Sequence, residues 1–200
     1  MKKRENTKGV IFIISGPSGS GKTTLAAKAL ASPRLKGKLA KSVSLTTRPR
    51  RTGEAGGRDY FFISRQEFLR QQRAKKILEW TRYLGYYYAT PKAFAEEQLA
   101  RGRSLVLCLD FKGLAQVRRI YPYRTVAIFV APPSLEDLRR RIEGRCRKTT
   151  KEEIARRLRL AQKELSGSGH YDYYLVNEDL KDAVGELEGI ILKHTQVQPE

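Results

Sequence analysis

A glycine-rich run near the start of the chain has the residue types and the spacing of a phosphate-binding loop. Its pattern is G-x-x-x-x-G-K-[ST], written here as Gly16-Pro17-Ser18-Gly19-Ser20-Gly21-Lys22-Thr23. Glycines at these places let consecutive backbone N–H groups converge on phosphate oxygens. The Lys22 ammonium can reach the β- and γ-phosphates of a nucleoside triphosphate, and the Thr23 hydroxyl can bind a magnesium ion. The alternative, a Gly/Ser-rich turn that happens to match, is disfavoured by the sequence on both sides.

The flanking sequence predicts the strand and the helix that such a loop needs. An apolar stretch at 10–14 precedes the loop, and residues 25–30 follow it as a helix. Further buried strands are expected at 104–110, 125–130 and 173–177. Strands that alternate with helices predict an α/β fold, in which a parallel sheet is flanked by helices. Ligands of such sheets bind beyond the carboxyl ends of the strands, where the loop, Asp110 and Asn177 are expected.

The remaining elements follow from caps and spacing. A helix should begin at Arg65, because Ser64 can cap it and Glu67 stands three places on, the spacing of a capping box. Pro91 suits the first turn of another helix, which Gly102 ends. The expected helices cover 65–75, 91–101, 135–142, 151–165 and 180–192. Short strands are expected at 41–45, 78–80 and 86–88.

The composition favours one compact domain. The chain has 200 residues, 40% of them hydrophobic, which is enough for one core with inserted lobes. No apolar run approaches the roughly 20 residues that span a bilayer, and no signal-like segment is seen. We therefore expect a cytoplasmic protein without a membrane partner. Its two cysteines, Cys108 in an expected buried strand and Cys146 in an expected exposed loop, are predicted to be reduced thiols without a catalytic role.

The charge is strongly positive, with 40 Lys and Arg against 21 Asp and Glu and a net charge of +19. Such a charge attracts polyanions. The basic residues are spread along the whole chain, however, and no short aromatic-basic module that stacks bases is seen. No specific nucleic-acid partner is therefore expected. A nucleic-acid binder remains the alternative, and its affinity for polymer would fall steeply with salt.

Two further blocks make the sequence more specific than its phosphate-binding loop alone. The first is Ser42-Val43-Ser44-Leu45-Thr46-Thr47-Arg48 with Arg51, Gly53-Glu54, Gly57 and Tyr60. The second is Ile77-Leu78-Glu79-Trp80 followed by Gly85-Tyr86-Tyr87-Tyr88. Together with the loop, in this order and spacing, they resemble the guanylate kinases, which transfer the terminal phosphoryl group of ATP to GMP. The resemblance runs from residue 10 to about residue 182.

The resemblance implies a GMP site that the chemistry of guanine supports. Guanine presents N1–H and N2–H as donors and O6 as an acceptor, so a selective site should offer a carboxylate beside hydroxyls. Glu79 matches the carboxylate, and Ser44 and Thr90 match the hydroxyls. Adenine would leave a buried Glu79 unpaired, so GMP should be preferred over AMP. The alternative for Glu79 is a solvated acid at a strand edge.

The resemblance also implies residues for the phosphates and for transfer. Arg48 and Arg51 with the phenols of Tyr60 and Tyr88 match the groups that bind the GMP phosphate. Asp110 matches an acid that helps to hold GMP. The expected catalytic residues are Lys22, Arg48, Arg141, Arg145 and Arg157, the last three as lid arginines that close over the phosphates. The expected ATP site adds Thr24 and Asn177 to the loop, with Mg2+ on Thr23. Any of these arginines could instead be a solvated surface charge.

The sequence departs from the family at two positions. An acid is usual where Cys108 stands and a glutamine where Lys112 stands, so the ordering of magnesium is in question. The segment 146–151 is also more basic than usual and one residue longer, which predicts atypical lid kinetics or nucleotide affinity.

The resemblance implies one domain with three regions. These are a core of 8–43, 91–135 and 158–195, a mixed-strand GMP-binding lobe at 44–90 and a helical lid at 136–157. We expect a monomer or homodimer that binds ATP and GMP, and dGMP as a second acceptor, in purine nucleotide metabolism. Two alternatives change the function. One is an inactive guanylate-kinase-like interaction module, which keeps the fold but typically lacks a working phosphate-binding loop. The other is a kinase of another small phosphorylated substrate, such as a sugar, which shares the loop.

Overall fold

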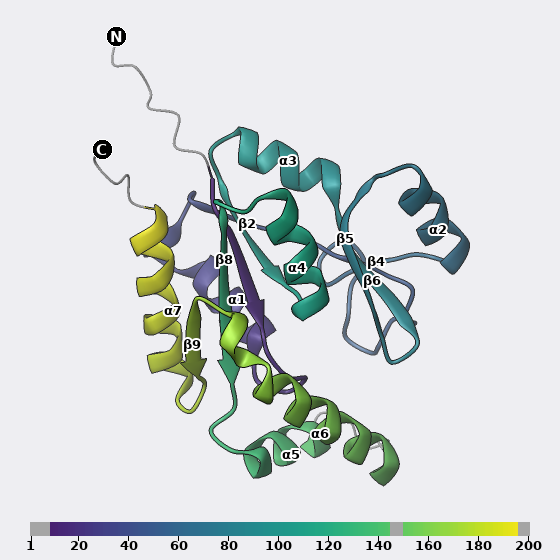
Figure 1. Cartoon of the computed structure of the whole chain (residues 1–200), viewed down its shortest axis with the longest axis vertical. Coiled ribbons are helices and arrows are strands. Elements are labelled where there is room, and N and C mark those ends of the chain that lie inside the picture. Colours follow the sequence, from purple (N-terminus) through teal and green to yellow (C-terminus); the bar gives the residue numbers. More distant parts are fainter. Residues whose placement is uncertain (1–8, 145–149, 196–200) are drawn as a thin grey trace. The chain divides into compact units, whose positions relative to one another are not determined.

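The computed structural model describes residues 9–144 and 150–195, which form an α/β fold with two sheets (Figure 1). The larger sheet has the strand order β2-β7-β1-β8-β9, and the smaller sheet has the order β4-β3-β6-β5. The strands are β1 Ile11–Ser15, β2 Leu39–Lys41, β3 Leu45–Thr46, β4 Phe61–Phe62, β5 Ile77–Tyr83, β6 Tyr86–Pro91, β7 Ser104–Cys108, β8 Thr125–Ala131 and β9 Tyr173–Val176. The α/β fold predicted from the sequence is confirmed.

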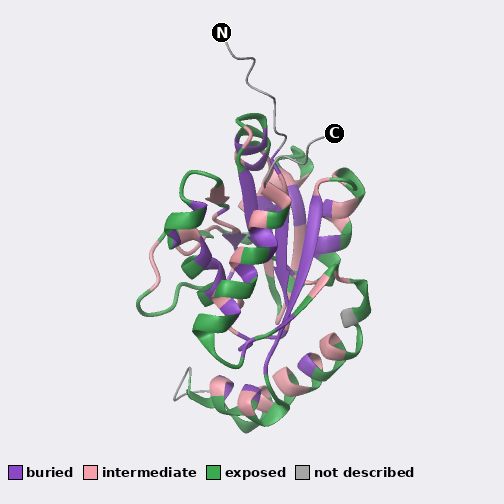
Figure 2. Cartoon of the chain, turned by 90° about the vertical axis from the view of Figure 1, so that its left-hand side faces the viewer, coloured by how far each residue is buried: buried purple, intermediate pink, exposed green. Residues whose placement is uncertain are grey.

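Helices follow most of the strands. They are α1 Lys22–Ala31, α2 Arg65–Arg73, α3 Lys92–Ala100, α4 Phe111–Ile120, α5 Leu135–Gly144, α6 Lys151–Ser166 and α7 Leu180–Thr195, with short 3-10 helices η1 Pro33–Leu35 and η2 Ser168–His170. Figure 2 shows buried residues concentrated in the strands, whereas the helices carry many exposed positions. Among the helices of the described residues, none is long and apolar enough to cross a bilayer.

The chain divides into two compact units, Met1–Ile11 with Gly37–Thr125 and Phe12–Lys36 with Val126–Glu200. In the first unit β2 and β7 pair in parallel, and the smaller sheet is mixed, because β3 pairs with β4 in parallel but with β6 antiparallel. Its apolar cluster is built on Leu45, Phe68 and Ala89. Phe68 stacks on Tyr87 at 4.4 Å between ring centroids, so α2 covers this sheet with an aromatic contact.

The second unit holds the phosphate-binding loop sequence. Its strands β8 and β9 pair in parallel, and α1 packs against α7. Helices α5 and α6 pack against each other around Leu138, Ile142 and Ala161. All seven residues of β8 are buried, as a strand covered on both faces requires.

Three predictions from the sequence need correction. Asp110 does not end a strand: β7 stops at Cys108, and Asp110 caps α4, a helix that the sequence analysis missed. Cys108 is exposed rather than buried, because it is the last residue of its strand. The expected strand at 41–45 is instead the end of β2 and the start of β3, and the residues between them belong to no strand. Cys146 lies outside the described residues.

The capping box at α2 is partly confirmed. The Ser64 hydroxyl accepts a hydrogen bond from the Glu67 N–H at 3.1 Å, as expected of an N-cap. The Glu67 carboxylate turns forward instead, and accepts hydrogen bonds from Arg70 and Gln71.

Candidate active site

The loop between β1 and α1 has positive φ angles at Gly16, Gly19 and Gly21, a backbone conformation that favours glycine. Gly16 and Gly21 have φ angles of 133° and 95°, which side chains disfavour. A Cβ atom on Gly16 would lie 2.1 Å from the Val130 carbonyl oxygen, and one on Gly21 would lie 2.2 Å from Nδ2 of Asn177. The loop therefore lies directly against the end of β8 and against Asn177, which follows β9 in the same unit, and both glycines are needed for this approach.

Hydrogen bonds to the carbonyl oxygens of Gly16, Pro17 and Ser20 hold the loop in this conformation. The Lys22 ammonium donates to the carbonyl oxygens of Gly16 at 2.6 Å and Pro17 at 2.8 Å. The buried Asn177 amide donates from Nδ2 to the Ser20 carbonyl oxygen at 2.7 Å. The buried Ser20 hydroxyl has no hydrogen-bond partner within the part of the chain that is described. Thr23 and Thr24, in the first turn of α1, are exposed.

A cavity of about 360 Å³ opens beside this loop. Its walls come from the loop, from α1, from α5 and from the chain after β9, and its lining residues are Gly19, Gly21, Thr24, Arg141, Gly144, Asn177, Glu178 and Leu180. The Arg141 guanidinium donates to the Asn177 carbonyl oxygen at 2.9 Å, so a cation stands at the wall of the cavity. Of the residues predicted for ATP, the structure thus brings Gly19, Gly21, Thr24 and Asn177 together with Arg141.

The other predicted lid arginines fall at different places. Arg157 lies on α6, with only 11% of its side chain exposed, and it pairs with Glu153 one turn earlier. Its buried Nε has no hydrogen-bond partner among the described residues. Arg145 falls in the interval 145–149, outside the described residues.

In the first unit, Glu79 of β5 is a buried carboxylate with one occupied oxygen. The residue is 2% exposed. Its Oε1 accepts a hydrogen bond from the Thr90 hydroxyl at 2.6 Å, while Oε2 has no partner among the described residues. Burial raises the pKa of Glu79 to about 7; the Thr90 hydrogen bond opposes this rise, and the negative charge of Asp110 adds to it. A carboxylate in this state has a free acceptor and a strong need for a donor.

Asp110 stands next to this group and is held by two hydrogen bonds. Its Oδ1 accepts from the Gly113 N–H at 2.9 Å, which makes it the N-cap of α4. Its Oδ2 accepts from the Thr81 hydroxyl at 2.6 Å. Thr81 lies two residues after Glu79 on β5, so the two side chains point to the same side of the strand. Asp110, which bonds Thr81, therefore lies on the same side of β5 as the Glu79 carboxylate.

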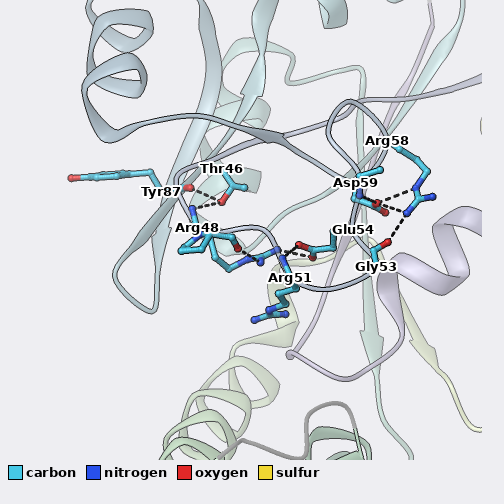
Figure 3. A network of polar contacts seen from close by, with 10 residues as sticks. Thr46, Arg48, Arg51, Gly53, Glu54, Arg58, Asp59 and Tyr87 are labelled. Carbon is cyan, nitrogen blue, oxygen red and sulfur yellow. Dashed lines mark hydrogen bonds and ion pairs between the residues drawn. The ribbon is translucent and has the colours of Figure 1, made fainter.

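Arg48 is a buried cation in a polar loop after β3 (Figure 3). Its Nη2 donates to Oε1 of Glu54 at 2.7 Å, and its Nη1 donates to the Pro49 carbonyl oxygen at 2.7 Å. The guanidinium carbon lies 5.4 Å from the centroid of the Tyr60 ring, within reach of a cation–π contact. The Glu54 carboxylate therefore binds the Arg48 guanidinium, which also lies over the Tyr60 ring.

Glu54 also organises the chain around Arg51. Its Oε2 accepts from the Arg51 backbone N–H at 2.8 Å, whereas the exposed Arg51 guanidinium extends away from it (Figure 3). Burial acts to raise the pKa of Glu54, but the hydrogen bonds from Arg48 and from the Arg51 backbone outweigh it and lower the pKa. This acid therefore stays ionised.

The remaining predicted GMP residues lie in or beside the same small sheet. Thr90 on β6 is fully buried and Tyr88 on the same strand is half-buried. Tyr88 meets Tyr60 edge to face, at 5.9 Å between ring centroids. The Ser44 carbonyl oxygen accepts a hydrogen bond from the Phe61 N–H at 2.9 Å, so the residue before β3 is bonded to β4 of the smaller sheet. Tyr60 and Tyr88 thus lie together with Arg48, and Thr90 lies with Glu79.

Sequence reasoning missed three of the residues that hold these side chains or the strand of Glu79. Thr81 and Glu54 were given no role, although they fix Asp110 and Arg48 respectively. Gln116 was missed with its helix: its side-chain amide bonds both the N–H and the carbonyl of Trp80 on β5. Glu54 could have been found, because it stands beside a glycine in the block that carries the family resemblance. Gln116 gave no such signal.

No group of three or more His, Cys, Asp or Glu side chains within the described ranges is placed to hold a metal ion. A cation at the phosphate-binding loop would therefore need ligands of another kind. The exposed Thr23 hydroxyl is one such oxygen, and phosphate oxygens of a bound nucleotide would be others.

Comparison with known proteins agrees with the resemblance seen in the sequence. The family model described as guanylate kinase matches residues 8–194. A guanylate kinase from Wolbachia pipientis wMel is 38% identical over 187 residues, which cover 94% of this chain and 91% of that protein. A guanylate kinase from Symbiobacterium thermophilum is 43% identical over 186 residues, or 92% of this chain and 85% of that protein.

A solved structure shows the same fold. The crystal structure of guanylate kinase from Anaplasma phagocytophilum matches with a TM-score of 0.79 and 33% identity, and the match covers 96% of this chain and 89% of that chain. Sequence and structure comparisons therefore agree over nearly the whole length. This chain belongs to the guanylate kinase family.

Proposed function

We propose that this protein is an ATP:GMP phosphotransferase. A phosphate oxygen of GMP attacks the γ-phosphorus of ATP, the bond to the bridging β–γ oxygen breaks, and ADP and GDP result. Membership of the guanylate kinase family supports this activity over an inactive interaction module and over a kinase of another substrate. The single observation that carries the choice of substrate is the buried Glu79 carboxylate, whose Oε2 has no hydrogen-bond partner among the described residues.

Guanine selection follows from the chemistry of that carboxylate. The N1–H and N2–H donors of guanine can satisfy Glu79, with the Thr90 hydroxyl already bonded to its other oxygen. Adenine offers an acceptor where guanine has N1–H, so AMP would leave a buried anion facing a lone pair. Asp110 and Ser44 supply further polar groups for the base. The GMP phosphate is bound by Arg48, Arg51, Tyr60 and Tyr88.

For transfer, the proposed role of the phosphate-binding loop is to hold ATP in position. The Lys22 ammonium donates to two loop carbonyl oxygens, which places its charge at the loop. With ATP bound, the ammonium would turn to the β- and γ-phosphates. The cavity beside Asn177 and Thr24 would take the ribose or adenine of ATP. Arg141, Arg145 and Arg157 would surround the transferred group with positive charge.

The proposed cofactor is Mg2+. Magnesium keeps several of its waters and binds through one or two protein oxygens together with the phosphates of its substrate. The donor set of the loop, one exposed Thr23 hydroxyl at the start of α1, fits that requirement. The ion would neutralise phosphate charge in the transition state. A cytoplasmic location, a monomer or homodimer, use of dGMP, a role in purine metabolism and the predicted lobe and lid boundaries remain predictions.

The test is product analysis with the intact chain. ATP and MgCl2 are incubated with GMP, AMP, CMP or UMP, and the nucleotides are separated by chromatography. We expect equal amounts of ADP and GDP from GMP, little product from the other three, and no product in excess EDTA. GMP binding without GDP would favour the interaction module. ADP without GDP, or phosphorylation of a sugar phosphate instead, would contradict the proposal.

A further inference from the structure

Helix α4 has a glycine at the place where it meets the Glu79 carboxylate. Gly113 lies in the first turn of this helix. A Cβ atom added there would lie 2.7 Å from Oε2 of Glu79 and 3.4 Å from its carboxyl carbon. Cβ atoms in proteins do not come so close to other atoms, so the Cβ of any residue other than glycine would overlap with Oε2 of Glu79. The oxygen concerned is the one without a partner among the described residues.

The helix cannot easily retreat to make room, because contacts on either side of Gly113 tie it to β5. Asp110, three residues earlier, accepts the hydrogen bond from the Thr81 hydroxyl. Gln116, three residues later, donates to the Trp80 carbonyl oxygen at 2.8 Å. These ties lie on the same face of α4 as Gly113. The distance between helix and strand is therefore fixed at the level of Glu79.

We propose that Gly113 is a specificity-determining position of the guanine site: its missing side chain leaves Oε2 of Glu79 in place as the acceptor for a guanine N–H. This inference rests on the proposed function and deepens it. Gly113 is a positioning residue that acts through Glu79.

A methyl group added at Gly113 should displace the Glu79 carboxylate rather than helix α4. A carboxylate is the far end of a flexible side chain and can rotate, whereas the other atom that the new Cβ meets, Cβ of Leu109 at 3.2 Å, is attached directly to the backbone. The helix itself gains from the change, because alanine is a better helix residue than glycine. In Gly113→Ala the Glu79 carboxylate should therefore be displaced while the fold is kept.

The experiment compares Gly113→Ala with Gly185→Ala. Gly185 lies inside α7, and an added Cβ there meets nothing within 4 Å, so it is a matched helical control. We expect the KM for GMP to rise about 10- to 100-fold in Gly113→Ala, the size of a lost hydrogen bond to a charged group. The KM for ATP should stay within about twofold of the control. The ratio of kcat/KM for GMP to that for AMP should also fall, because the affinity for GMP is reduced.

A double variant tests whether the effect passes through Glu79. In a Glu79→Ala background the methyl group has room, so adding Gly113→Ala should change the KM for GMP by less than about twofold. If Gly113→Ala alone fails to fold, the double variant should regain a cooperative melting transition, because the clashing carboxylate is gone. A double variant that stays unfolded would overturn the inference.

The outcomes separate this inference from the proposed function. If the unmodified protein phosphorylates GMP and Gly113→Ala matches Gly185→Ala in KM for GMP, the inference alone fails. If Gly113→Ala raises the KM for ATP as much as that for GMP, its effect is general and the inference also fails. If the unmodified protein forms no GDP, the proposed function fails first.

Discussion

Nη2 of Arg48 lies 2.7 Å from Oε1 of Glu54, and the arginine that this acid holds is only 8% exposed. A buried guanidinium needs a counter-charge and fixed hydrogen bonds. Glu54 provides both, and through Oε2 it also fixes the backbone of Arg51. One acid thus orders the two arginines that are proposed to bind the GMP phosphate.

Replacing Glu54 by alanine should therefore weaken GMP binding. We expect the KM for GMP to rise about tenfold, because Arg48 loses its orientation, while the KM for ATP is unchanged. Steady-state kinetics with each substrate varied in turn measures this. The control is Glu67→Ala, which removes an acid that pairs with Arg70 on the exposed surface of α2. Equal KM values for GMP in the two variants would contradict the account.

Replacing Lys22 by alanine should abolish transfer without affecting GMP. The ammonium is the group proposed for the β- and γ-phosphates, so we expect turnover to fall at least about 100-fold. GMP binding, measured by calorimetry without ATP, should be the same as in the unmodified protein. Lys28→Ala, an exposed lysine on the same helix, is the control. A Lys22→Ala variant with normal turnover would remove the loop from the mechanism.

Replacing Asn177 by alanine should act on ATP alone. The Nδ2 group donates to the Ser20 carbonyl oxygen inside the loop, and its loss leaves a buried acceptor unpaired, at a cost of about 1–3 kcal/mol in stability. With the loop less ordered, the KM for ATP should rise about tenfold. Thermal melting and kinetics measure the two effects. A rise in the KM for GMP instead would place Asn177 outside the ATP site.

The Glu79 carboxyl makes stability depend on pH. Because burial raises its pKa from 4.5 to about 7, the folded chain keeps this proton between these pH values, whereas the unfolded chain has lost it. The unfolding free energy from this group should therefore fall as pH rises through that window, by about 3 kcal/mol in total. Glu79→Gln carries no such charge. Its melting temperature should exceed that of the unmodified protein at pH 8 and match it near pH 4.5.

The same titration should appear in GMP binding. Only the ionised carboxylate can accept both guanine N–H groups, so the affinity for GMP should fall as pH drops below about 7. Calorimetry in two buffers of different ionisation enthalpy, at pH 6.5, should detect proton release by the unmodified protein. Glu79→Gln should release less. Equal proton release by both proteins would mean that Glu79 is not the group that titrates on binding.

The sequence predicted the fold where one local signal decided the element. The phosphate-binding loop, the buried strand β8 and the N-cap at Ser64 all have such signals. Helix α4 was missed because Asp110 closes an apolar run and looks like the end of a strand, while Gly113 weakens the helical pattern after it. The structure shows instead that Asp110 begins the helix. The wrong prediction that Cys108 is buried follows from the same misplaced boundary.

The candidate site was predictable in its residue types but not in its support. Arg48 and Glu79 could be chosen from chemistry and from the family resemblance. The contacts that hold the strand of Glu79 could not, because the bond of Gln116 to Trp80 joins residues 36 positions apart, and only the packing of α4 on β5 brings them together. Such contacts depend on tertiary structure, which no local pattern encodes.

The most direct test of the account is the ratio of kcat/KM for GMP to that for AMP, in the unmodified protein and in Glu79→Gln. Glutamine keeps the shape of the side chain but has an amide donor in place of one oxygen. We predict a strong preference for GMP that falls at least about 100-fold in the variant, while the KM for ATP is unchanged. A ratio that stays the same in Glu79→Gln would contradict the central claim that this buried carboxylate selects guanine.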